Sequence, residues 1–304
     1  MSRLQSLFLV ALFPLPAVAQ VAPSLGTLRS RIVERVGQSP GATVGIYIRN
    51  LGDGKEISLN ADTSFHAAST MKVPVMIEYF RAVDEGRISP SATTTLQNSF
   101  NSIVDGSNFT LDAGDDSDSS LYARVGQEVG VRELVERMIT RSSNLATNSV
   151  IALVNAHKAD ATARALGARN MHVLRGVEDN KAFRAGRNNT TTAHDLGMLF
   201  LAIAEGRAAS RGASQTMLDI LAHQEFNEEI PAGLPPGTRV AHKTGWITGT
   251  LHDAALVFPP GRAPFVLVVL TGGIADEKVA RTLIQDVARL TWEALVPSPQ
   301  RTFR

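Results

Sequence analysis

Strand-like segments stand near both ends of the chain, and the residues between them carry an almost entirely helical pattern. Residues 43–49 and 56–59 alternate as strands do, and the turn residues between them predict a hairpin. Strands return late, at residues 239–242, 251–258 and 265–270, and the last is an apolar run suited to burial on both faces. A sheet built from both ends of the chain must therefore accommodate a large helical insertion.

Apolar residues recur at helical spacing from about residue 69 to residue 203. The predicted helices lie at residues 69–83, 131–139, 144–154, 160–166 and 193–204 in this block, and at 23–36 and 275–295 outside it. The pattern predicts one α/β part, about 22–66 and 223–304, and one all-α part, about 67–222. The cleft between these parts is the natural place for a functional site.

Residues 1–19 have the pattern of a secretory signal peptide. Arg3 supplies a positive start, residues 7–15 an apolar stretch, and Ala17-Val18-Ala19 a small-residue cleavage site. The alternative, a membrane anchor, is disfavoured because the stretch is shorter than the ~20 apolar residues that span a bilayer, and prolines interrupt it. We expect cleavage after Ala19, which leaves residues 20–304 as a periplasmic or secreted protein with no stable membrane anchor.

Charge and cysteine content exclude several classes of function. The 30 basic and 29 acidic side chains give a net charge of +1, so nothing indicates a nucleic-acid partner. The sequence has no cysteine, which excludes disulfides and thiol catalysis. The histidines show no zinc spacing, and the acidic stretch 112–120 departs from the calcium-loop pattern. We therefore expect no metal or organic cofactor, and interpret the acidic stretch as a solvated loop.

The first candidate for chemistry is Ser69-Thr70-Met71-Lys72, at the start of a predicted helix. Residues three apart share a helix face, so the Lys72 side chain can reach the Ser69 hydroxyl. A serine becomes a good nucleophile when a base takes its proton, and a lysine with a lowered pKa can be that base. The helix N-terminus adds N–H groups that favour a developing oxyanion. Taken alone, S-x-x-K is better explained by a serine N-cap followed by a solvated lysine, because the pattern should occur about once by chance in a chain of this length.

Two further motifs favour the catalytic interpretation. Ser142-Ser143-Asn144 lies between two predicted helices, and Lys243-Thr244-Gly245 ends a predicted strand. S-x-x-K, S-D-N and K-T-G in this order are the signature of class A β-lactamases and penicillin-binding proteins. The chain resembles the class A β-lactamase family over most of its mature length, and departs from S-D-N only at Ser143. The resemblance implies an antiparallel sheet with flanking helices built from both termini, a central helical domain, and an active site in the cleft between them.

The resemblance also implies a role for each motif residue. Ser69 would attack a β-lactam amide, Lys72 would help to activate it, and Ser142 would pass a proton towards the leaving nitrogen. Backbone N–H groups of Ser69 and Trp246 would form the oxyanion hole. The other substrate-binding residues would be Lys243 and Thr244, for a carboxylate, Asn144, for an amide, and Gly245, which lets the substrate backbone approach. Structural alternatives are a helix N-cap for Asn144 and a surface strand lysine for Lys243.

The group that hydrolyses the acyl-enzyme is the main departure from the family pattern. Class A β-lactamases carry an acidic residue in an E-x-x-L-N loop, and no such pentapeptide occurs here. In the stretch before Asn189, Glu178 is the best-placed carboxylate for a general base that activates the deacylating water. Because Asp179 follows it, a surface acidic pair is an equally good interpretation.

A second departure is His252, on the strand after K-T-G. It falls near the place where many relatives have an arginine for the substrate carboxylate. A histidine is charged only as the pH approaches its pKa, which is ordinarily about 6.5. If His252 binds the carboxylate, kcat/KM for an anionic penicillin should fall between about pH 6 and 8.

These features predict an exported serine hydrolase, a β-lactamase that confers antibiotic resistance by opening the β-lactam ring through an acyl-Ser69 intermediate. We expect a monomer that acts on a small molecule. Three alternatives stay open. The first is a penicillin-binding D,D-peptidase, which would act on a peptidoglycan stem peptide and release β-lactams slowly. The others are another serine amidase or esterase, and a non-catalytic binder of peptidoglycan or β-lactams.

Overall fold

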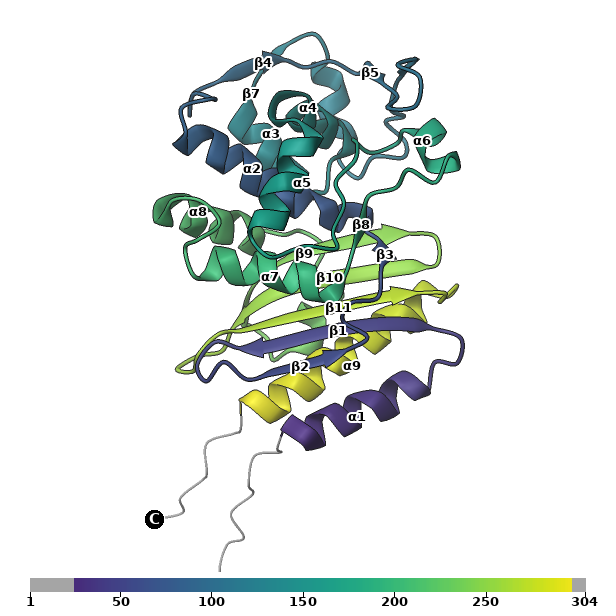
Figure 1. Ribbon diagram of the computed structural model, residues 1–304, viewed down its shortest axis with the longest axis vertical. Helices are drawn as coiled ribbons and strands as arrows, with labels where there is room; N and C mark the ends of the chain where they lie inside the picture. Colours follow the sequence, from purple (N-terminus) through teal and green to yellow (C-terminus); the bar gives the residue numbers. More distant parts are fainter. Residues whose placement is uncertain (1–24, 297–304) are drawn as a thin grey trace, which may run out of the picture.

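A five-stranded antiparallel sheet joins the two ends of the chain (Figure 1). The computed structural model describes residues 25–296, so the predicted signal peptide lies outside the described residues. The strand order is β2-β1-β11-β10-β9. The strands are β1 (Thr43–Asn50), β2 (Glu56–Leu59), β9 (Arg239–Ile247), β10 (Thr250–Phe258) and β11 (Phe265–Gly272). β1 pairs with β11, Thr43 opposite Gly272, which is the sheet that the strand pattern predicts.

Both faces of this sheet are covered, which accounts for the continuous apolar run in β11. Leu267 and Val269 face a cluster shared with α1 (Leu25–Gly37) and α9 (Glu277–Leu295), below the sheet in Figure 1. Val268 and its alternate neighbours face the helical part above the sheet. Each such buried aliphatic side chain contributes roughly 1.5–3 kcal/mol, so the sheet holds the two helical layers together.

The helical part begins beside the edge strand β9. Within it, α7 (Ala193–Ala204) packs on β1, β10 and β11. The other helices are α2 (Lys72–Asp84), α3 (Val131–Thr140), α4 (Asn144–Val154), α5 (Ala156–Ala165), α6 (Asn180–Arg184) and α8 (Arg211–Ala222). The sequence pattern predicted the main helices of this part but missed α8 and the short α6.

The central block departs from the all-α prediction, because short strands interrupt its helices. It contains the short strand pairs β4 (Thr93–Thr95) with β7 (Glu128–Gly130) and β5 (Phe100–Asn101) with β6 (Asn108–Phe109), and the strand β8 (Thr190–Thr191), which pairs with β3 (Phe65–His66) just before the block. Strands of two or three residues are too short to show an alternating pattern. Between residues 25 and 296 the order also includes the 3-10 turns η1 (Ala68–Met71), η2 (Ser119–Arg124) and η3 (Pro231–Gly233).

The described part of the chain contains no helix that is both long and apolar enough to cross a bilayer. It also contains no group of three or more His, Cys, Asp or Glu side chains arranged to hold a metal ion.

Candidate active site

The site begins where β9 packs on the turn η1. The K-T-G triplet lies inside β9, which continues to Ile247, whereas the sequence placed it at a strand end. A methyl group on Gly245 would come within 3.1 Å of the backbone nitrogens of Ser69 and Thr70. The backbone that lies close to Gly245 is therefore that of Ser69 and Thr70. We had expected the substrate backbone to make this close approach.

Ser69 follows a residue in a strained conformation. Ala68 has φ +45°, a left-handed value that costs a residue with a side chain roughly 1–3 kcal/mol. The backbone N–H of Ala68 donates to Nδ1 of His66 at 3.1 Å, and Ala67 N–H donates to Asn189 O at 2.9 Å. These contacts hold the conformation of the turn η1. Ser69 is half-buried and lines the cleft.

Lys72 is completely buried at the start of α2. Its Nζ donates to Ser142 O at 2.6 Å, to Ser142 Oγ at 3.1 Å and to Asn144 Oδ1 at 2.9 Å. Burial lowers the pKa of Lys72 well below its ordinary value, and the nearby Lys243 lowers it further. The predicted contact with Ser69 Oγ is not among the hydrogen bonds found within residues 25–296; the amine is turned towards the S-x-N motif instead.

The Ser142 hydroxyl accepts hydrogen bonds from two lysine side chains, Lys72 and Lys243. Lys243 is fully buried, so the alternative of a surface strand lysine is wrong. Its Nζ donates to Ser142 Oγ at 3.1 Å and to Thr244 O at 2.9 Å. Burial lowers the pKa of Lys243 to about 7, against the opposing charges of Asp253 and Glu229. Ser142 has φ +56°, and this left-handed backbone presents its hydroxyl to both amines.

Asn144 connects Lys72 to the predicted deacylating carboxylate. Its Oδ1 accepts from Lys72 Nζ, and its Nδ2 donates to Glu178 Oε1 at 3.1 Å. The N-cap of α4 is Ser143, whose Oγ accepts from Ala146 N at 3.2 Å. The alternative of a helix N-cap for Asn144 is therefore wrong, and its side chain is free to face the cleft.

Glu178 and Asp179 do not form a surface pair. Asp179 is buried, and its oxygens accept from Ser102 Oγ and from Ile103 N, both at 2.9 Å. Glu178 has φ +62° and opens onto the cleft beside Ser69. Although Glu178 is exposed in the cleft, desolvation by the surrounding protein raises the pKa of its carboxyl, with nearby Asp115 acting in the same direction and Lys72 opposing.

The segment before Glu178 is fastened to α4. Val177 N–H donates to Asn148 Oδ1 at 2.7 Å, and Asn148 Nδ2 donates back to Val177 O at 3.0 Å. A methyl group on Gly176 would come within 2.4 Å of Asn148 Oδ1, so it would push the Asn148 amide away from Val177. Because Asn148 and Asn144 lie on the same helix, α4 holds the carboxylate and its hydrogen-bond partner in a fixed relation.

These groups line one cleft of about 590 Å³, within the range of small-molecule sites. Its lining includes Ser69, Ser142, Asn144, Glu178, Thr244, Gly245 and Trp246, all of them predicted from the sequence. The Trp246 side chain stands at the rim with 56% of its surface exposed. The structure thus gathers the motif residues of three distant segments around one space.

Three predicted site residues do not line this cleft: Lys72 and Lys243, which are buried and contact the lining residue Ser142, and His252. The His252 ring is fully buried, with Nε2 2.9 Å from His66 O and Nδ1 2.9 Å from Leu251 O. Burial lowers its pKa to about 4, so the ring is neutral from pH 6 to 8. The expected carboxylate contact and its pH dependence are therefore corrected: His252 lies opposite Gly245 on the same face of the sheet, but β3 covers its ring, with the Phe65 ring 5.6 Å away.

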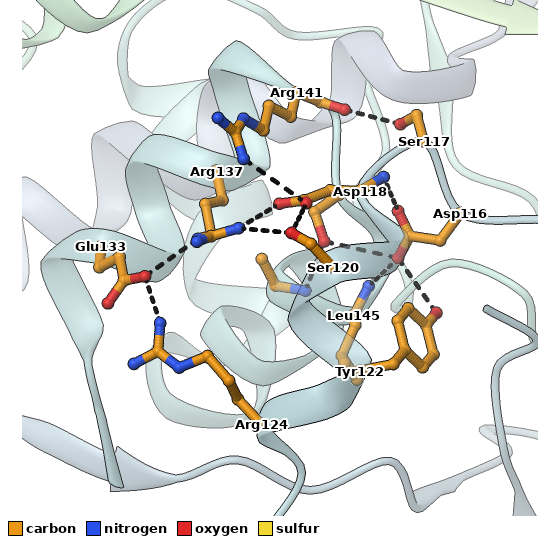
Figure 2. A network of polar contacts seen from close by, with 12 residues as sticks. Asp116, Ser117, Asp118, Ser120, Tyr122, Arg124, Glu133, Arg137, Arg141 and Leu145 are labelled. Atoms are coloured by element: carbon orange, nitrogen blue, oxygen red, sulfur yellow. Dashed lines mark hydrogen bonds and ion pairs between the residues drawn. The ribbon is translucent and has the colours of Figure 1, made fainter. Parts of the chain in front are cut away.

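The acidic stretch 112–120 is not simply a solvated loop, because two of its carboxylates are buried. Asp116 is 7% exposed and Asp118 is 4% exposed. Figure 2 shows Asp116 at the start of α4, where it accepts from backbone N–H groups, and Asp118 beside Arg137 of α3, with which it pairs at 2.8 Å. Sequence reasoning missed Asp116 near the site, since a carboxylate that contacts a distant helix N-terminus leaves no local spacing to recognise.

Comparison with known proteins gives the family. The sequence model described as "Beta-lactamase enzyme family" matches residues 27–295. The chain belongs to this family. Membership confirms the predicted family and the predicted enzyme class, a serine β-lactamase hydrolase.

Relatives in the β-lactamase family match over most of their length. The β-lactamase AST-1 of Nocardia asteroides is 28% identical over 270 residues, which cover 84% of this chain and 80% of the relative. The carbapenem-hydrolyzing β-lactamase KPC of Klebsiella oxytoca is 27% identical over 305 residues, 97% of this chain and 98% of the relative.

Solved structures agree with the fold. A β-lactamase from Sphaerobacter thermophilus superposes with a TM-score of 0.78 at 27% identity, covering 91% of this chain and 100% of that one. PBP-A superposes with a TM-score of 0.76 at 28% identity, covering 90% and 98%. The predicted architecture, a sheet from both termini with a helical part inserted, is confirmed.

Proposed function

We propose that this protein hydrolyses β-lactams through a covalent acyl-enzyme formed on Ser69. The acylation half of this reaction rests on Ser69, Lys72 and Ser142. The lowered pKa of Lys72 supports a neutral amine, which has only two N–H groups and so gives up one of its three hydrogen bonds and turns a lone pair towards Ser69 Oγ to receive its proton. Ser142 Oγ, 3.1 Å from that amine, then relays a proton to the nitrogen that leaves when the β-lactam C–N bond breaks.

The oxyanion and the substrate carboxylate have separate partners in this proposal. Backbone N–H groups of Ser69 and Trp246 stabilise the negative oxygen of the tetrahedral intermediate. Lys243 and Thr244 bind the carboxylate, and the anion itself favours the protonated lysine. The exposed Trp246 ring offers an apolar surface for a substituent of the substrate.

Deacylation is the step that separates a β-lactamase from a penicillin-binding peptidase. The observation that carries the proposal is the hydrogen bond from Asn144 Nδ2 to Glu178 Oε1 at 3.1 Å. It places a carboxylate on the same cleft as Ser69, joined through Asn144 to Lys72. Glu178 is then the general base that takes a proton from water as the water attacks the acyl carbonyl.

Replacement of Glu178 tests this step. Glu178→Gln should leave the rate of acylation by benzylpenicillin within about twofold and slow deacylation by at least ~10²-fold, as expected for loss of a general base. The acyl adduct should then accumulate in intact-mass spectra. Glu228→Gln is the matched control, because Glu228 lines the same cleft and is well exposed. Equal deacylation by the Glu178→Gln variant and the wild type would contradict the assignment.

A penicillin-binding D,D-peptidase is the second candidate, and the structural likeness to PBP-A favours it. Both functions use the same acylation groups and differ in how fast the β-lactam leaves. A peptidase should release D-alanine from a peptidoglycan stem peptide and hold benzylpenicillin as a stable adduct. Release of D-alanine together with slow turnover of benzylpenicillin would replace the β-lactamase assignment.

We also propose that the protein is exported and acts as a monomer, in the periplasm or the medium. The charge, apolar stretch and small-residue site of residues 1–19 support export. N-terminal sequencing of the exported protein should begin at Gln20, and an intact N-terminus would contradict cleavage.

A further inference from the structure

The S-x-N motif of this chain lacks an acid, and a carboxylate from another segment lies beside it. Ser143 stands where the family signature has aspartate. Asp116, from the stretch before η2, places its Oδ2 at 2.9 Å from Asn144 N and 2.8 Å from Leu145 N. The same oxygen is 3.4 Å from Ser143 Oγ. A buried carboxylate thus contacts all three residues that follow Ser142.

We propose that Asp116 is a positioning residue that supplies from a separate loop the carboxylate missing from the S-x-N motif. Its function is to hold Ser142 and Asn144 in the arrangement that acylation requires. The inference rests on the proposed function, because it concerns the efficiency of the Ser69 reaction.

The contacts of Asp116 satisfy the start of α4. The first N–H groups of a helix have no partner inside the helix. Asp116 accepts from those of Asn144 and Leu145, while Ser143 accepts from that of Ala146. A negative charge at this end also interacts favourably with the helix dipole. Asp116 thereby fixes the backbone to which the Asn144 side chain is attached.

The residue just before this cap is the strained one. Ser142 is left-handed at φ +56°, and its Oγ must meet Lys72 and Lys243 at 3.1 Å each. A non-glycine residue keeps such a conformation only where its surroundings enforce it. On the C-terminal side the enforcing contact is Asp116; on the N-terminal side Ser117 Oγ donates to Arg141 O at 2.6 Å. The loop that contains Asp116 and Ser117 therefore contacts the backbone on both sides of Ser142.

Asp116 is itself held by neighbours. Tyr122 OH donates to its Oδ2 at 3.0 Å, and Asp118 N–H donates to its Oδ1 at 3.0 Å. Asp118 pairs in turn with Arg137 at 2.8 Å (Figure 2). The carboxylate of Asp116 thus has a fixed orientation, and only Asp116 of the two acids contacts the N-terminus of α4.

The test measures acylation by a chromogenic cephalosporin in single-turnover experiments, with the melting temperature recorded separately. Asp116→Ala should slow acylation by roughly 10- to 100-fold at a temperature where the fold is intact, because small displacements of reacting groups have effects of this size. If this variant does not fold, Asp116→Asn keeps the shape and one oxygen, and should slow acylation by roughly tenfold. Acylation at the wild-type rate by a folded variant would overturn the proposal.

Asp118→Ala is the matched control for a purely structural effect. It removes a buried carboxylate from the same loop and breaks the pair with Arg137, but leaves both Asp116 contacts to α4 in place. We expect a lower melting temperature with acylation within about threefold of the wild type. Equal losses of acylation in the two variants would mean that the loop acts only through stability, and would overturn the positioning role.

Moving the carboxylate back into the motif gives a second readout. Aspartate is a good N-cap, so Ser143→Asp can accept from the first N–H groups of α4. In the wild-type background it places two carboxylates side by side and should slow acylation; in the Asp116→Ala background it should restore at least part of the rate. If Ser143→Asp slowed acylation in both backgrounds, or accelerated it in both, the proposal would be overturned. Failure of the wild type to form any acyl adduct would instead refute the proposed function.

Discussion

Replacement of His252 by glutamine should change how the protein responds to acid without changing how it binds substrate. The His252 ring is fully buried, and its Nε2 meets His66 O at 2.9 Å. A glutamine amide can donate to the same carbonyl oxygen, so His252→Gln keeps the hydrogen bond and removes the titrating group. Any difference in pH dependence between the two proteins then reports on this ring alone.

The magnitude follows from proton linkage. Burial lowers the pKa of His252 from the ordinary 6.5 to about 4. Between these values the unfolded chain binds more protons than the folded one, so stability rises with pH and is lost as the pH falls from 6.5 towards 4. At ~1.4 kcal/mol per pH unit, the full interval corresponds to ~3 kcal/mol, of which ~2 kcal/mol is lost by pH 5.

The assay is urea unfolding at pH 7.5 and pH 5 for both proteins. The wild type should lose ~2 kcal/mol more than His252→Gln on acidification. His157→Gln, at an exposed position on α5, is the control and should lose as much as the wild type. Identical pH dependence in the wild type and His252→Gln would refute the burial argument. A changed kcat/KM profile between pH 6 and 8 in His252→Gln would restore the residue to the binding site.

Two glycine substitutions test the packing around the site. Gly245→Ala places a methyl group 3.1 Å from the backbone nitrogen of Ser69, so we expect a loss of ~1–3 kcal/mol in unfolding free energy and slower acylation. Urea unfolding and single-turnover acylation measure this, and an unchanged acylation rate would mean that β9 and η1 separate freely. Gly176→Ala drives a methyl group against Asn148, which fastens the segment before Glu178, so deacylation should slow more than acylation. Equal slowing of both steps would show that this segment does not act through Glu178.

Much of the fold could be predicted because its elements are long and strongly patterned. The alternating strands and the apolar run of β11 predict a sheet from both chain ends, and the three motifs predict which segments meet. The two-residue strands β3, β5, β6 and β8 lie below the length at which periodicity can be seen. The extent of β9 was underestimated because Thr244, Gly245 and Trp246 carry little apolar alternation.

The sequence predicted those site residues whose role follows from the motif in which they stand. It did not predict residues whose role depends on contacts with distant segments. His252 lies on the expected strand, opposite Gly245, but whether its ring reaches the cleft depends on what packs over it, and Phe65 and His66 of β3 cover it. Asp116 contacts a helix that begins 28 residues later, a separation at which no local pattern exists. Glu178 was one of two adjacent acids, and only the burial of Asp179 against Ser102 shows which of them faces the cleft.

The most direct test of the proposed reaction is an intact-mass time course of the mature protein mixed with excess benzylpenicillin. The account predicts an adduct on Ser69 that forms quickly and disappears as the penicillin is consumed, with no adduct on a Ser69→Ala variant. An adduct that persists after acylation would show that Glu178 does not activate water and would support the peptidase. An adduct that remains on Ser69→Ala would contradict the nucleophile itself.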